Sequence, residues 1–194
     1  MSPPARSPAA LCRFFLTAAA GLTLDLWTKW LAFQSVHVIT LPDGQVRAYA
    51  GDPYQVIPGW LQFEVTANQG AVFGLGQGLR VIFIIASLGA AAFLTYLFTQ
   101  SGKKWGTQIV LGMLLAGVLG NLYDRARLGY VRDMIRALPR WPHFFPWIFN
   151  VADSLLCVGV GLMILHSLIY PTPSNSGAKI KASGDSTPNA SHGN

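Results

Sequence analysis

Four apolar segments, each about 20 residues long, constrain what this chain can fold into. They run from about Leu11 to Phe33, Leu79 to Thr99, Trp105 to Tyr123 and Phe149 to Tyr170. A bilayer core roughly 30 Å thick needs about 20 residues of α-helix. In lipid, a helix is the single-segment structure that satisfies its own backbone hydrogen bonds. The segments therefore predict an all-α polytopic membrane protein with four transmembrane helices.

The composition agrees with lipid as the solvent for most of the chain. Of its 194 residues, 52% are hydrophobic and only 11% are charged, whereas soluble domains carry about 25% charged residues. The formal net charge is +6, but the basic residues lie at the ends of the apolar segments. This pattern favours membrane lipids as partners and argues against nucleic acid. Cys12 and Cys157 lack the spacing of a zinc site or a disulfide framework.

The loop between the second and third segments predicts the orientation. Ser101-Gly102-Lys103-Lys104 is a short turn with two lysines, and such loops stay in the cytoplasm. Both termini then lie in the cytoplasm, and the loop of about residues 34–78 faces outward. The loop between the third and fourth segments would also face outward, although residues 125–140 include five arginines. We assign these arginines to lipid headgroups and substrate; an inverted orientation is the alternative.

Outside the spans, two regions have a distinct composition. In the first outer loop, β-forming segments at 55–57 and 61–65 flank the turn Pro58-Gly59, which predicts a small extracytoplasmic β-sheet. Residues 1–170 would form the membrane domain. Residues 171–194, rich in Ser, Gly, Asn, Pro and Lys, predict a disordered cytoplasmic tail.

Four aspartates lie within or beside the spans, where an ionised group is costly. With the predicted topology, Asp25, Asp124, Asp133 and Asp153 all lie toward the outer side. Residues three or four apart share a helix face, as do Asn121 with Asp124, Asn150 with Asp153, and Asp25 with Lys29. Helix caps and interhelical hydrogen bonds are the alternative interpretation, which stays open for Asp25 and Asp124. Two carboxylates that share a site cannot both ionise easily, so one stays protonated while the other activates water. The chain has no HExxH motif for a metalloprotease.

Five short segments resemble motifs of the lipoprotein signal peptidases, in the order of that family. Asp25-Leu26-Trp27-Thr28-Lys29 is similar to D-x-x-S/T-K, and Asn68 to Gly74 to N-x-G-A-x-F-G. Gly120 to Arg125 is similar to G-N-x-x-D-R, and Gly129 to Asp133 to G-x-V-x-D. Phe149 to Ser154 is similar to F-N-x-A-D-S. The resemblance implies catalytic roles for Asp133 and Asp153. It implies substrate-binding or supporting roles for Asp25, Lys29, Asn68, Gly70, Asn121, Asp124, Arg125, Asn150 and Ala152, and no metal or other cofactor.

The same resemblance implies an aspartic endopeptidase. Its substrates would be bacterial prolipoproteins that carry diacylglycerol on cysteine, cut on the N-terminal side of that cysteine. We expect a monomeric, multi-pass protein of the cytoplasmic (inner) membrane, with its active site near the outer face. Two other functions stay open: a proton-coupled carrier or channel, and a catalytically silent scaffold that binds signal peptides.

Two features of the loop at residues 125–148 bear on substrate preference. After Asp133 the family continues with an aromatic residue and a second acid, whereas this chain has Met134-Ile135-Arg136. The loop is also rich in aromatic residues. We expect Trp60 of the first outer loop, with Trp141, Phe144, Phe145 and Trp147, to form an ordinary aromatic belt at the membrane interface.

Overall fold

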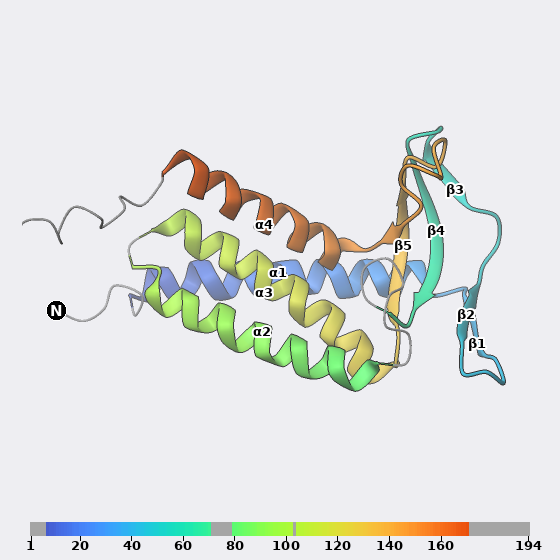
Figure 1. Ribbon diagram of the computed structural model, residues 1–194, viewed down its shortest axis with the longest axis horizontal. Coiled ribbons are helices and arrows are strands. Elements are labelled where there is room, and N and C mark those ends of the chain that lie inside the picture. The colour runs from blue at the N-terminus through green and yellow to red at the C-terminus, as the bar shows by residue number, and fades with distance from the viewer. Residues whose placement is uncertain (1–6, 71–78, 103, 171–194) are drawn as a thin grey trace, which may run out of the picture.

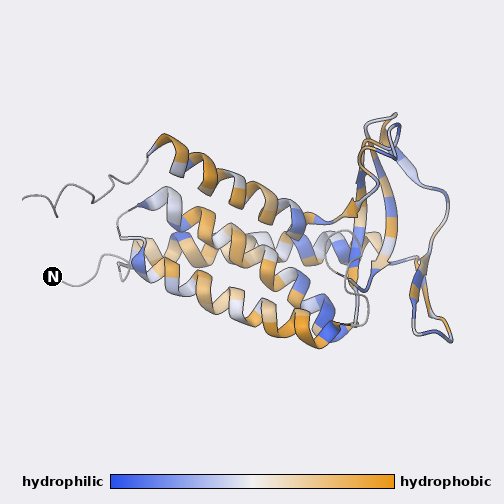
Figure 2. Ribbon diagram, in the orientation of Figure 1, coloured by the Kyte–Doolittle hydropathy of each residue, from blue (hydrophilic) through white to orange (hydrophobic). Residues whose placement is uncertain are grey.

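Four long helices form a bundle, and two small β-sheets lie at one end of it (Figure 1). The structure is a computed structural model that describes residues 7–70, 79–102 and 104–170. The helices are α1 (Pro8–Ala32), α2 (Arg80–Gln100), α3 (Trp105–Arg127) and α4 (Val151–Ile169). All four are long and apolar enough to cross a membrane, and most of their residues are hydrophobic (Figure 2). The four predicted spans are therefore confirmed as helices.

The strands make the label "all-α" incomplete. A hairpin pairs β1 (His37–Thr40) with β2 (Val46–Tyr49). A second, antiparallel sheet has the order β3 (Tyr54–Ile57), β4 (Leu61–Asn68), β5 (Val131–Ala137), β6 (Ile148–Phe149). The sequence predicted β3 and β4. We missed β5 and β6 because the loop after α3 was interpreted through its arginines and motif residues, and its strands pair only with partners distant in sequence.

Capping residues in the sequence explain where two of the helices begin. Ser7 caps α1, with its hydroxyl accepting a hydrogen bond from the backbone N–H of Ala10, and Pro8 fits the first turn because it needs no donor there. Asn150 and Asp153 form a reciprocal capping box at the start of α4. The third helix continues past the predicted end at Tyr123 to Arg127, so Asp124 lies in its last turn.

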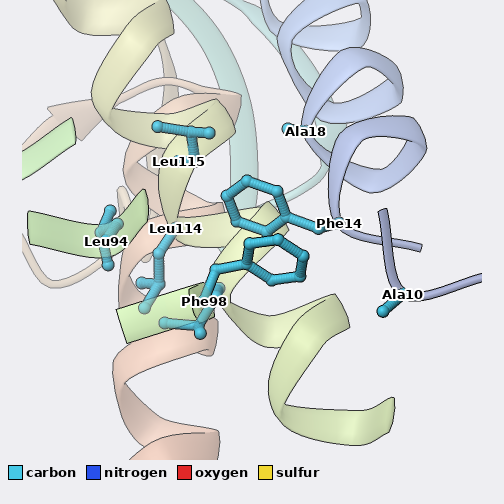
Figure 3. Close-up of a cluster of buried hydrophobic side chains, with 8 residues drawn as sticks. Ala10, Phe14, Ala18, Leu94, Phe98, Leu114 and Leu115 are labelled. Carbon is cyan, nitrogen blue, oxygen red and sulfur yellow. The ribbon is translucent and has the colours of Figure 1, made fainter. Parts of the chain in front are cut away.

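The third helix is the centre of the bundle and packs against the other three. At the end opposite the sheets, the rings of Phe14 and Phe98 stack 4.2 Å apart beside Leu114 and Leu115 (Figure 3). Closer to the sheets, glycines let the helices approach. A Cβ on Gly117 would lie 2.6 Å from the carbonyl oxygen of Ala152. The small residues of α3 thus hold α4, and the residues at its start, close to α1 and α3.

We expect Gly117→Ala to destabilise the protein by about 1–3 kcal/mol, because the backbone of α4 must move to admit the methyl group. Gly161→Ala on α4 is the matched control, since nothing lies within 4 Å of the added Cβ. Thermal unfolding followed by tryptophan fluorescence measures both variants. Equal midpoints for the two would contradict the close packing of α3 against α4.

The predicted tail at residues 171–194 and the remainder of the Asn68–Gly74 motif, residues 71–74, lie outside the described residues. The division into a membrane domain and a tail stays a prediction.

Candidate active site

The polar residues singled out in the sequence meet where the helices end against the four-stranded sheet. Figure 2 shows hydrophilic segments of the helices at this end of the bundle, as well as at the opposite end. Three helices and two strands contribute to the cluster, and most of its side chains are buried. The contributing residues are Asp25 and Lys29 of α1, Asn121, Asp124 and Arg125 of α3, Asn150 and Asp153 at the start of α4, Asn68 of β4, and Asp133 of β5.

Asp133 lies in the middle of β5 and is only 1% exposed. Its Oδ1 accepts a 2.6 Å hydrogen bond from Nδ2 of Asn150, and its Oδ2 accepts one of 3.0 Å from Nδ2 of Asn68. Burial, followed by the nearby charge of Asp153, raises the pKa of Asp133 to about 7, and these two hydrogen bonds oppose the shift only in part. At neutral pH this carboxyl group can therefore hold or release a proton.

Asp153 is held by the first turn of α4. Its Oδ2 accepts a hydrogen bond from the backbone N–H of Asn150, and its own N–H donates to Oδ1 of Asn150. Its Oδ1 accepts a 2.8 Å hydrogen bond from Nδ2 of Asn121. A helix N-terminus favours a negative charge. Asp153 therefore lies where an ionised carboxylate is stabilised, and unlike Asp133 it is partly exposed.

Two asparagines connect the two aspartates. Nδ2 of Asn150 donates both to Asp133 and, over 3.2 Å, to Oδ1 of Asn121. Oδ1 of Asn121 also accepts a 3.0 Å hydrogen bond from the ammonium group of Lys29. Because this oxygen faces two donors, the amide nitrogen of Asn121 is left to face Asp153. Lys29 thus fixes the direction in which Asn121 presents its amide.

A buried ion network lies beneath the aspartate pair. The ammonium of Lys29 is 2.8 Å from Oδ2 of Asp25 and 3.5 Å from Oδ2 of Asp124, and all three side chains are 0% exposed. Arg132 reaches Asp124 over 2.7 Å. Oδ1 of Asp25 accepts a hydrogen bond from the backbone N–H of Ala152 in α4. Two acids and two bases balance in charge, which offsets the cost of burying each.

Sequence reasoning assigned the arginines of this loop to headgroups and substrate, and the structure pairs two of them internally. Arg132 binds Asp124, and Arg136 binds Glu64 of β4 over 2.7 Å. Arg125 instead donates to the carbonyl oxygen of Gly70 and lies over the ring of Phe83. No sequence signal identified Arg132 as a partner of Asp124, because the contact depends on how β5 turns back after α3.

Gly70 completes the support on the β4 side. Its N–H donates a 3.0 Å hydrogen bond to Oδ1 of Asn68, which leaves the Asn68 amide nitrogen to donate to Asp133. A side chain is thereby oriented by a backbone group two residues away. All the predicted site residues, from Asp25 to Asp153, are connected in one network by the contacts given above, with Arg125 linked through Gly70.

A cavity of about 620 Å³ opens beside this network. It lies between the end of α1, the β1–β2 hairpin and the sheet, and Met134, Ile135 and Val151 line it. Met134 directly follows Asp133 in sequence, and Val151 directly follows Asn150. Neither Asp133 nor Asp153 lines this cavity itself. The two carboxyl groups are linked through Asn150 and together form a pair that can polarise a water molecule. Within residues 7–70, 79–102 and 104–170, no group of three or more His, Cys, Asp and Glu is arranged to hold a metal ion.

Comparison with known proteins gives a consistent result. The family model described as Signal peptidase (SPase) II matches residues 17–169. The lipoprotein signal peptidase of Enterococcus faecalis is 33% identical over 159 residues, covering 80% of this chain and 88% of that protein. The one from an Anaeromyxobacter species is 32% identical, covering 81% and 84%. A bacterial membrane enzyme solved by the in meso method at 2.3 Å resolution superposes with a TM-score of 0.70 at 28% identity, covering 87% of this chain and 93% of that one.

Proposed function

This chain belongs to the signal peptidase II family, and on that premise we propose that it is an aspartic endopeptidase that cleaves prolipoproteins. The substrate would carry diacylglycerol on its cysteine, and the cut would fall on the N-terminal side of that cysteine. The observation that carries the mechanism is the connection of Asp133 and Asp153 through Asn150, which binds both. The resemblance of the surrounding motifs supports the same pair.

In this mechanism the two aspartates share one proton. Asp133 holds it, because burial raises its pKa, and Asp153 is ionised at the start of α4. Asp153 takes a proton from water, whose oxygen attacks the carbonyl carbon of the scissile peptide bond. Asp133 gives its proton to the carbonyl oxygen. Asp153 then gives the proton that it took from water to the leaving nitrogen, and Asp133 takes a proton back from a hydroxyl group of the tetrahedral intermediate. The C–N bond breaks, and the pair again holds one proton.

The substrate would reach this site from the lipid. A signal peptide is an apolar helix that can lie beside the bundle, while the acyl chains on its cysteine stay in the bilayer. The apolar cavity lined by Met134 and Val151 would hold substrate residues on one side of the scissile bond. The sequence that connects α2 and α3 contains two lysines, and this supports cytoplasmic termini and an active site near the outer face of the inner membrane. We expect the protein to act as a monomer.

The two other functions suggested by the sequence are less well supported. A proton relay requires titratable groups along the whole span, whereas the contacts connect these acids in one cluster at the ends of α1, α3 and α4. A silent scaffold has no need for a buried aspartate whose pKa lies near neutrality.

A gel-shift cleavage assay tests the proposal. The purified protein is given a diacylglyceryl-modified prolipoprotein and, in parallel, the same precursor without the lipid. We expect cleavage of the lipidated form alone. Equal cleavage of both forms would contradict the proposed substrate, and failure of the folded protein to cleave either would contradict the reaction itself.

The pH dependence tests the shared proton. Asp133 keeps its proton below a pKa of about 7 and loses it as the pH rises through that value. The active, singly protonated pair then disappears, so the cleavage rate is expected to fall about tenfold per pH unit above pH 7. Initial rates measured with saturating lipidated substrate between about pH 6 and pH 9 give the profile. A rate that stays constant or rises over this range would exclude Asp133 as the group that holds the proton.

A further inference from the structure

The far end of the four-stranded sheet forms a compact surface that the proposed reaction does not use. We call it the sheet tip: the β3–β4 turn at residues 58–60 and the β5–β6 loop at residues 138–147. Backbone hydrogen bonds join the two segments, from Leu138 N to Trp60 O at 2.7 Å and from Arg140 N to Gly59 O at 3.4 Å. Figure 1 shows this end of the sheet projecting beyond α4, transverse to the long axis of the helices.

The sheet tip exposes large aromatic side chains. Trp60 is 55% exposed, Trp141 43% and Phe144 75%. The rings of Trp60 and Trp141 meet edge to face, with their centroids 5.3 Å apart. Three neighbouring aromatic side chains that are exposed to water are unfavourable in free energy. Such side chains are favoured in the region of a membrane where the headgroups meet the acyl chains. The sheet lies at one end of four helices that are long and apolar enough to cross a membrane, so a tip that projects sideways from it would lie at headgroup depth.

Beside these rings lies an open groove of about 370 Å³ that contains two arginines. Arg136 uses one end of its guanidinium for Glu64, and among the described residues its buried Nε has no hydrogen-bond acceptor. Arg140 is exposed and makes no salt bridge within the described part of the chain. The charge of Glu64 offsets that of Arg136, so the positive charge of Arg140 remains as the net charge of the groove. The guanidinium of Arg140 also has N–H groups that can donate hydrogen bonds to a ligand. Gln55 and Gln62 line it as well.

We propose that the sheet tip is a binding site for an anionic phospholipid, with the phosphate held in the groove by Arg136 and Arg140. Guanidinium groups bind phosphate through charge-assisted hydrogen bonds. The acyl chains pass beside Trp60, Trp141 and Phe144 into the bilayer next to α4. A free phosphate would satisfy the same donors, but it would leave the exposed parts of the Trp60, Trp141 and Phe144 rings in water, and this favours the lipid. The bound lipid would hold the sheet, and with it Asp133 of β5, against the membrane surface.

Native mass spectrometry of the full chain released from detergent tests this proposal. Three probes are titrated: phosphatidylglycerol, diacylglycerol with the same acyl chains, and glycerol phosphate as its ammonium salt. We expect phosphatidylglycerol to bind most tightly and the other two only weakly. Arg140→Gln should weaken phosphatidylglycerol binding by about tenfold, the effect of one lost charge-assisted hydrogen bond. This exposed residue is a better target than Arg136, whose removal would also break the pair with Glu64.

Arg47→Gln is the matched control, because it removes the same charge from an exposed position on β2. It should bind phosphatidylglycerol as the wild type does. Equal losses in the Arg47 and Arg140 variants would mean that overall charge alone attracts the lipid, and no loss in Arg140→Gln would remove the site. Equal binding of diacylglycerol would show that the phosphate is not recognised, and equal binding of glycerol phosphate would make this a free-anion site. No peptidase turnover is required, so the outcome is independent of the proposed reaction.

Discussion

Asp153→Asn and Asp133→Asn are each expected to lower the rate of prolipoprotein cleavage by at least about 10³-fold. Asparagine can neither take a proton from water nor give one to the carbonyl oxygen. Asp153→Asn therefore removes the group that activates water, and Asp133→Asn removes the group that protonates the carbonyl oxygen. The shape of the side chain is retained, and one oxygen can still accept a hydrogen bond from Asn121 in the first variant or from Asn68 or Asn150 in the second. The gel-shift assay with lipidated precursor measures the loss.

Asp43→Asn is the matched control for these variants. Asp43 lies in the exposed turn of the β1–β2 hairpin, where its carboxylate accepts a hydrogen bond from the N–H of Gln45, two residues away. We expect wild-type rates for this variant. Circular dichroism and the thermal midpoint establish that all variants are folded. Turnover within tenfold of wild type in a folded Asp133 or Asp153 variant would refute the assignment of that residue.

Lys29→Met is expected to lower the free energy of unfolding by about 3–5 kcal/mol, the usual cost of removing one partner from a buried ion pair. The variant leaves Asp25 and Asp124 buried, and in the described part of the chain Arg132 is then the one residue that forms a salt bridge with either. It also frees Oδ1 of Asn121 from its charged donor, so the amide can turn away from Asp153. Unfolding followed by tryptophan fluorescence gives the stability, and kcat reports on the position of Asn121.

A double-substituted variant separates the buried charge from a general packing defect. In Asp25→Asn combined with Lys29→Met, the unpaired carboxylate is gone and the new amide oxygen can still accept from Ala152. Part of the lost stability should therefore return. Lys104→Met, at an exposed position before α3, is the control and should unfold like the wild type. A double variant less stable than Lys29→Met would contradict the charge argument.

The extent of the helices could be predicted from the sequence because the requirement is local. A run of about 20 apolar residues must be helical in lipid whatever its neighbours do. The spacing of Asn150 and Asp153 predicted one shared helix face. The structure instead places Asn150 before the helix, in extended backbone, where it and Asp153 cap the start of α4. The five motifs assigned Asp133 and Asp153 a common role. The family is confirmed by the comparisons, while the catalytic role of the pair stays a prediction.

The tertiary structure decided what depends on pairing between distant segments. The sequence gives no local sign that β5 pairs with β4, yet this pairing sets Thr66 opposite Asp133 and brings the amide of Asn68 to its carboxylate. The ion pairs of Arg132 with Asp124 and of Arg136 with Glu64 follow from the same strand. The sequence shows how many arginines this segment contains, but it does not show which acid each one binds. The partners are set only when β5 pairs with β4 and places Arg132 and Arg136 beside Asp124 and Glu64. The raised pKa of Asp133 has the same origin, since it is the folded chain that buries this carboxyl group and brings Asp153 close to it.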